Sequence, residues 1–181
     1  MKLLIASDLH GSAYWTRRLI GSVSEEMPDR ILLLGDLLYH GPRNDLPRDY
    51  APKEVISLLS PLAKQLLCVR GNCDTEVDQM VLPFPILADY AVLVVGNRLL
   101  YASHGHHPEA VIPYLTDTGN IYLQGHTHIP MCEDKDGYLH LNPGSVSIPK
   151  ENSPHAYMTC EDGVFLWKDL ENGTVFKEYR I

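Results

Sequence analysis

The sequence predicts a single α/β domain over residues 1–181, with two sheets packed face to face and helices outside. Two observations predict it. The first half alternates short apolar runs with amphipathic stretches, in the order strand, loop, helix. The second half contains apolar runs in pairs around Gly-containing turns, which is typical of hairpins. A length of 181 residues with 45% hydrophobic residues fits one domain with an ordinary buried core.

The first half is expected to be mostly parallel. Its buried strands are predicted at residues 3–6, 31–34 and 66–69. Between them, apolar residues recur at helical spacing, which predicts crossover helices at residues 14–27 and 53–65. The segment 37–51 is rich in Gly, Pro, Asn and charged residues, so we expect a long loop there. Long loops inside compact domains tend to carry function.

The second half is expected to be antiparallel. Two hairpins are predicted, formed by residues 90–95 with 98–103 and by residues 131–133 with 138–141. A closing set of three strands is predicted at residues 156–160, 164–169 and 174–179, separated by Asp-Gly and Asn-Gly turns.

Several classes of protein are disfavoured. No apolar run approaches the roughly 18 to 20 residues of a membrane span. Asp8 and His10 interrupt the first apolar run, so no export signal is visible. Four cysteines without paired spacing indicate neither a disulfide framework nor a thiolate zinc site. We therefore expect a cytoplasmic protein that does not act in a membrane.

The formal net charge of −8 argues against binding a nucleic-acid polymer, because affinity for a polyphosphate backbone comes from clustered Lys and Arg. A small anionic substrate remains compatible with this charge, since bound metal ions dominate the local potential of a cleft.

Polar motifs follow five predicted strands. They are Asp8-Leu9-His10, Gly35-Asp36, Gly71-Asn72-Cys73-Asp74, His104-Gly105-His106 and Gly125-His126-Thr127-His128. Loops at the carboxyl ends of strands form the ligand crevice of open α/β sheets, so these clusters can converge on one point. Each motif alone is more often an ordinary turn. Five such motifs, each with metal-competent side chains, favour a metal site.

This ordered series of motifs resembles that of the calcineurin-like metallophosphoesterases, with D-x-H, G-D, G-N-[HC]-[DE], H and G-H-x-H in sequence. The resemblance spans Asp8 to His128 and continues through Asn142-Pro143-Gly144-Ser145. More narrowly, the segment 35–44 and the Cys of Gly71-Asn72-Cys73-Asp74 resemble the YfcE-type group of bacterial phosphodiesterases. The implied fold is a two-sheet αββα sandwich with a dinuclear metal site at the strand carboxyl ends.

The resemblance also implies the metal ligands. One ion would be held by Asp8, His10 and His128. The other would be held by Asn72, His104 and His126, with Asp36 bridging both. A bridging carboxylate suits this site physically, because two ions about 3.5 to 4 Å apart repel each other and need shared negative charge.

The implied activity is hydrolysis of small phosphodiesters, with a metal-bridging hydroxide as the nucleophile. Two divalent ions with two carboxylates and a hydroxide leave a net charge of about +1, which stabilises the phosphoryl group in the transition state. Imidazole, carboxylate and carboxamide ligands suit manganese, zinc, iron, cobalt or nickel. The resemblance makes manganese the expected ion.

Cys73 departs from the commoner family pattern, in which a His at this position stabilises the transition state or protonates the leaving group. A thiol with an ordinary pKa near 8.5 is a poor hydrogen-bond donor. The enzyme is therefore expected to favour diesters with good leaving groups, or to use His106 in place of the missing group. Cys73 is equally compatible with a small packing role below the metals.

Two other functions stay open. The fold resembles a scaffold subunit of the eukaryotic retromer, which keeps a decayed metal site and binds partner proteins. All seven ligand positions here carry metal-competent residues, which disfavours a scaffold role. A phosphomonoesterase or cyclic-nucleotide hydrolase would use the same ligands. Edge strands in the last hairpins would permit a homo-oligomer.

Overall fold

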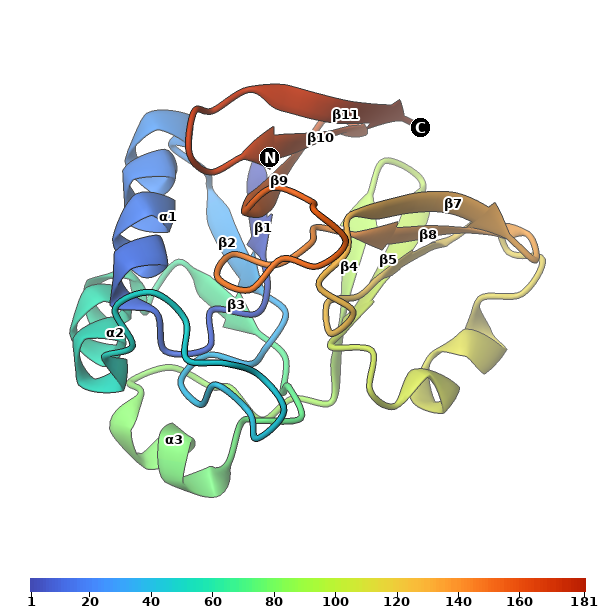
Figure 1. The fold of residues 1–181 in the computed structure, drawn as a ribbon. Helices are drawn as coiled ribbons and strands as arrows, with labels where there is room; N and C mark the ends of the chain where they lie inside the picture. Colours follow the sequence, from blue (N-terminus) through green and yellow to red (C-terminus); the bar gives the residue numbers. More distant parts are fainter.

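The computed structural model describes residues 1–181 as two sheets packed face to face (Figure 1). The first sheet has six strands in the order β11-β10-β9-β1-β2-β3. Its strands are β1 (Leu3–Ala6), β2 (Arg30–Leu33), β3 (Leu66–Cys68), β9 (Ala156–Glu161), β10 (Val164–Asp169) and β11 (Val175–Arg180). The second sheet has five strands in the order β4-β5-β6-β8-β7. Its strands are β4 (Tyr90–Val95), β5 (Arg98–Ser103), β6 (Ile121–Leu123), β7 (Met131–Lys135) and β8 (Tyr138–Asn142).

In the first sheet, β1 and β2 are buried on both faces, and successive side chains of each strand point to opposite sides. In β1, Leu4 and Ala6 join a core cluster with the helices, whereas Leu3 and Ile5 face the second sheet. The helices α1 (Ala13–Glu26) and α2 (Pro52–Leu59) cover the outer face, as Figure 1 shows in blue and teal. Continuous apolar runs in β1 and β2 are the sequence signature of this double burial.

The second sheet buries one face against the first sheet, through residues such as Leu100, Ile121 and Leu139. Its other face is covered in part by the segment 108–118, which contains two single-turn 3₁₀ helices, η2 (Pro108–Ala110) and η3 (Ile112–Tyr114). The predicted two-sheet αββα arrangement is confirmed, with this outer layer much thinner than the α1–α2 layer.

Two parts of the topology differ from the prediction of a parallel first half and an antiparallel second half. The closing strands join the first sheet, because β9 pairs antiparallel with β1. In the second sheet, β6 pairs parallel with both β5 and β8, so both sheets are mixed. The short helix α3 (Glu76–Val81) was not predicted. The helix predicted at residues 53–65 is shorter in the structure, where α2 ends at Leu59 and is followed by the 3₁₀ turn η1 (Ser60–Leu62).

The long loop predicted after β2 is confirmed, since residues 37–51 contain no helix or strand. Its end is fixed to the start of α1, where the Ser12 hydroxyl donates to the Arg48 carbonyl at 2.6 Å and Ser12 forms a β-bridge with Tyr50. None of the helices in the chain combines the length and apolar character needed to cross a bilayer.

Candidate metal centre

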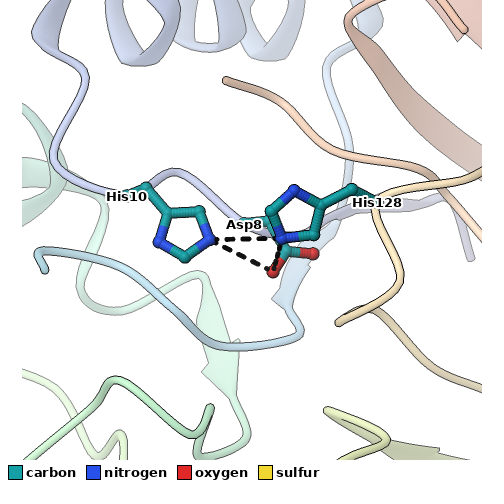
Figure 2. A group of neighbouring side chains, drawn as sticks. All are labelled: Asp8, His10 and His128. Carbon is teal, nitrogen blue, oxygen red and sulfur yellow. Dashed lines mark hydrogen bonds and ion pairs between the residues drawn. The ribbon is translucent and has the colours of Figure 1, made fainter. Parts of the chain in front are cut away.

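Side chains that follow β1 and β6 form the first of two clusters. Asp8 Oδ1 lies 3.6 Å from His10 Nε2 and 3.2 Å from His128 Nε2. The two imidazole Nε2 atoms are themselves 3.3 Å apart. Figure 2 shows the three side chains pointing at one another, with His128 reaching in from a different part of the chain. This is the set of ligands that the sequence predicted for the first ion.

Asp36, at the end of β2, lies between this triad and a second group. Its Oδ2 atom is 3.6 Å from His10 Nε2 and 3.4 Å from His104 Nε2. The other oxygen, Oδ1, accepts a hydrogen bond from the Cys73 backbone N–H at 2.8 Å. One carboxylate oxygen therefore faces donors of both groups while the other holds the side chain in place.

The second group is centred on His104, which follows β5. Its Nε2 atom lies 3.1 Å from Asn72 Oδ1 and 3.3 Å from His126 Nδ1. The structure thus brings all seven predicted ligand side chains together, in the two groups that the resemblance implied.

Three of the imidazoles are oriented by backbone carbonyls. In each case Nδ1–H donates to a carbonyl oxygen: His10 to Tyr39 at 2.8 Å, His104 to Leu34 at 2.6 Å and His128 to Ile148 at 2.6 Å. Such bonds are typical of metal-bound histidines, because they fix the ring and leave the Nε2 lone pair for the ion. The three rings are therefore arranged to offer Nε2 to the centre.

The backbone is strained at five of the seven predicted ligands. Asp8, His10, Asp36, His126 and His128 have φ values of 61°, 45°, 55°, 66° and 64°. Non-glycine residues rarely adopt this left-handed conformation, and clusters of such residues are typical of functional sites. Here the conformation turns the chain sharply after each strand, so that the side chains point back toward a common centre.

Asp74 organises two of these turns. Its carboxylate accepts backbone N–H bonds from Asp36 at 2.9 Å, Leu37 at 2.9 Å and Gly71 at 2.7 Å. It thereby ties the loop after β2 to the loop after β3. Asp74 belongs to one of the five sequence motifs but had no predicted role, and an acidic residue two positions after a ligand was the available signal.

Ser145 and Ser147 support the other side of the centre. Their hydroxyls donate to the Asp8 carbonyl at 3.0 and 2.9 Å. Asn142 holds the neighbouring turn, since its amide donates to the Gly125 carbonyl at 2.8 Å. The Asn142-Pro143-Gly144-Ser145 motif therefore contributes hydrogen bonds to the backbone beside two predicted ligands, Asp8 and His126.

The electrostatics of the cluster fit cations. Burial opposes ionisation of Asp8, but contacts with His10 and His128 outweigh burial and hold the pKa of Asp8 well below its ordinary value. Burial likewise opposes protonation of His104, yet Asp36 and Asp8 raise the pKa of His104 to about 9. Two buried carboxylates thus depend on positive charge nearby, which divalent ions would supply in exchange for imidazole protons.

One buried oxygen without a hydrogen-bond partner also indicates that the cluster binds cations. Asp8 Oδ1 is buried and makes no hydrogen bond, although its partner Oδ2 accepts one from the His126 backbone N–H at 3.1 Å. A buried carboxylate oxygen without a partner is costly unless a cation binds it. The residues present therefore fit divalent metal ions, which would bind Asp8 through this oxygen.

Cys73 lies at the centre, with its Sγ atom 3.2 Å from Asn72 Nδ2. Burial and the nearby Asp36 carboxylate raise the pKa of the Cys73 thiol, so the thiol stays neutral at neutral pH. His106 lies behind His104, with ring centroids 5.4 Å apart, and burial with the nearby His104 lowers the pKa of His106 to about 4. That Cys73 or His106 takes part in leaving-group protonation stays a prediction.

Comparison with known proteins identifies the family of the chain. The family model described as the calcineurin-like phosphoesterase superfamily domain matches residues 1–163. Phosphodiesterase YfcE of Escherichia coli K12 is 43% identical over 183 residues, which cover 100% of this chain and 98% of YfcE.

Solved structures show the same fold. The E. coli YfcE phosphoesterase structure superposes with a TM-score of 0.94 at 40% identity, over 100% of both chains. Wild-type Vps29 from Entamoeba histolytica in complex with Zn²⁺ shares the fold, with a TM-score of 0.66 at 23% identity over 100% of this chain and 98% of Vps29. With the metal-competent cluster at the strand ends, these matches establish that the chain belongs to the calcineurin-like phosphoesterase superfamily.

Proposed function

We propose that the chain is a metal-dependent phosphodiesterase that hydrolyses small phosphodiesters. The observation that carries the proposal is the position of Asp36 Oδ2, 3.6 Å from His10 Nε2 and 3.4 Å from His104 Nε2, between two complete groups of metal-competent side chains. The name of YfcE, at 43% identity, supports the diester as substrate.

Each donor group has a definite task in this proposal. Asp8, His10 and His128 would hold one divalent ion, Asn72, His104 and His126 the other, and Asp36 both. When bound, the ions would supply Lewis acidity and a hydroxide nucleophile at neutral pH. Manganese is the proposed ion, although this set of nitrogen and oxygen ligands also suits zinc, iron, cobalt or nickel.

The protein itself orients the donors before any substrate arrives. The carbonyls of Tyr39, Leu34 and Ile148 fix three imidazole rings, and the Asp74 carboxylate fixes the Asp36 backbone. Donors that need not rearrange during the reaction stabilise the transition state most effectively. No buried Lys or Arg side chain competes with the ions for the two carboxylates.

The absence of a strong acid at position 73 supports diesters over monoesters. The Cys73 thiol is a weak donor, so diesters with good leaving groups, such as phenoxides that depart without a proton, would be favoured. Small diesters rather than nucleic-acid polymers are proposed, because the chain carries a net charge of −8. Four unpaired cysteines support a reducing, cytoplasmic location.

The test compares hydrolysis of bis(p-nitrophenyl) phosphate and p-nitrophenyl phosphate by chelator-stripped protein, with and without added manganese. Manganese-dependent turnover that favours the diester is expected. Turnover that favours the monoester would replace this proposal with a phosphomonoesterase. Lack of turnover with every divalent metal would instead support the partner-binding scaffold, for which the Vps29 match shows the fold alone.

A further inference from the structure

A cavity of about 450 Å³ adjoins the metal centre and extends well beyond it. Five of its lining residues are predicted metal ligands, and Cys73 is a sixth. The remainder of the wall is formed by Gly41, Pro42, Arg43, Asn44, Thr127 and Lys150. A volume in this range accommodates a ligand much larger than a single phosphate group. The wall beyond the metal ligands is therefore available to contact the rest of a substrate.

Part of this wall is formed by the turn at residues 41–44, in the loop after β2. Gly41 is buried with φ 80°, and the Asn44 side-chain amide donates to the His40 carbonyl at 2.8 Å. A Cβ atom on Gly41 would lie 3.3 Å from Cys73 Sγ, so the turn packs directly on Cys73. The exposed Arg43 belongs to this turn and lines the cavity.

Lys150 lines the same cavity from another loop. Its backbone N–H donates to the His128 carbonyl at 3.2 Å, and its carbonyl accepts the Ser153 backbone N–H at 3.0 Å. The Ser153 hydroxyl donates to the same carbonyl at 2.6 Å. The backbone of Lys150 is thus fixed beside a ligand of the first group, and two cations reach the cavity from two different loops.

Neither Arg43 nor Lys150 forms an ion pair within the chain. Other basic residues do, including Lys2 and Lys168 with Glu26, and Arg17 with Asp49 and Glu54. Asp36 is the only carboxylate on the cavity wall. Eight further Lys and Arg side chains also lack an ion pair, so what distinguishes Arg43 and Lys150 is that they are the two Lys or Arg side chains on this cavity wall.

Charge counting indicates what they bind. Two divalent ions with the Asp8 and Asp36 carboxylates and the hydroxide leave a charge of about +1, which a simple phosphodiester with its charge of −1 already balances. Arg43 and Lys150 add two further positive charges on the same wall. We propose that Arg43 and Lys150 form a subsite for a second phosphate group, so that the substrate is a diester carrying a phosphate besides the scissile one. This inference rests on the proposed phosphodiesterase function.

The test uses a pair of diesters that differ only in that group: thymidine 5′-(p-nitrophenyl phosphate) with and without a 3′-phosphate. In both, water adds to the 5′-phosphorus, the bond to the nitrophenyl oxygen breaks with its electron pair, and one proton is released. The manganese-loaded protein is expected to show about tenfold higher kcat/KM for the 3′-phosphorylated diester, since charge-assisted bonds to phosphate are strong.

Arg43→Gln and Lys150→Gln are each expected to reduce this preference about threefold, and the double variant to remove it. Lys64→Gln, which removes an exposed charge away from the cavity, should retain the full preference. Binding gives an independent readout: calorimetry should show tighter binding of thymidine 3′,5′-bisphosphate than of thymidine 5′-monophosphate, and the double variant should abolish the difference.

The outcomes separate the two proposals. If both diesters are hydrolysed at equal rates and both products bind equally, the phosphate subsite is wrong while the phosphodiesterase function stands. If neither diester is hydrolysed with any divalent metal, the proposed function itself fails. A preference that survives in the double variant would also overturn the roles of Arg43 and Lys150.

Discussion

The two carboxylate oxygens of Asp36 have different contacts. Oδ1 accepts the Cys73 backbone N–H at 2.8 Å, while Oδ2 faces His10 and His104. Substitution by Asn keeps an oxygen for the first task and removes the charge needed for the second. Asn also tolerates the φ of 55° found at this position better than most residues, so the fold should be retained.

We therefore expect Asp36→Asn to lose metal at both positions and to lose activity by at least about a hundredfold, because it removes shared charge between two ions. Metal content after dialysis and hydrolysis of bis(p-nitrophenyl) phosphate measure the two effects. Circular dichroism provides the check on folding. A variant that keeps two ions and full turnover would refute the bridging assignment.

Residue 73 decides whether a general acid faces the leaving group. If the missing acid limits the rate, Cys73→His should raise turnover of p-nitrophenyl phosphate by about tenfold or more, within the range of general acid catalysis. Cys73→Ser serves as the control, since it keeps a small side chain without adding an imidazole. Since a Cβ atom on Gly41 would already lie 3.3 Å from Cys73 Sγ, the larger ring has to be accommodated beside the 41–44 turn or in the cavity. Unchanged monoester turnover in the His variant would contradict the hypothesis.

At the scale of the elements, the loops after β2 and β3 approach so closely that Gly71 has no room for a side chain. A Cβ atom there would lie 2.1 Å from Asp36 Oδ1 and 2.3 Å from the Asp36 backbone nitrogen. Both neighbours belong to the strained ligand turn, and neither can move without displacing Asp36. The glycine thus sets the spacing between two strand ends.

Gly71→Ala is accordingly expected to weaken metal binding by about tenfold to a hundredfold, like other changes to residues that position ligands. Gly21→Ala is the matched control: it lies in α1, where an added Cβ atom would meet no heavy atom within 4 Å, and should stabilise the helix by about 0.5–1 kcal/mol. Metal titration and thermal unfolding report the two quantities. Wild-type metal affinity in Gly71→Ala would show that the turns can separate freely.

The same elements show what sequence could and could not predict. Apolar runs and turn residues act locally, so the strands before Asp8, Asp36, Asn72 and His104 and the long loop after β2 were predictable. Pairing of β9 with β1 joins segments about 150 residues apart, and local periodicity carries no information about such partners. The left-handed φ values at the ligands also escaped prediction, because they reflect the surrounding structure rather than the residue type.

At the scale of the whole molecule, the metal centre joins the two sheets. Asp8 and Asp36 follow β1 and β2 of the first sheet, whereas His104 and His126 follow β5 and β6 of the second. Elsewhere the sheets contact each other through a 16-residue apolar cluster. Bound ions would therefore add polar cross-links at the edge where that apolar interface ends.

We expect removal of metal to lower the thermal stability of the entire chain. A ligand that binds only the folded state at a hundred times its Kd stabilises it by about 2.7 kcal/mol, and a domain of this size shifts by about 2–4 °C per kcal/mol. Addition of manganese to chelator-stripped protein should thus raise Tm by about 5–10 °C, measured by calorimetry. Asp36→Asn should show less than half of that shift at the same concentration, because its ligand turns remain but their shared charge is gone. An equal shift in both proteins would place the stabilising ions somewhere other than between the sheets.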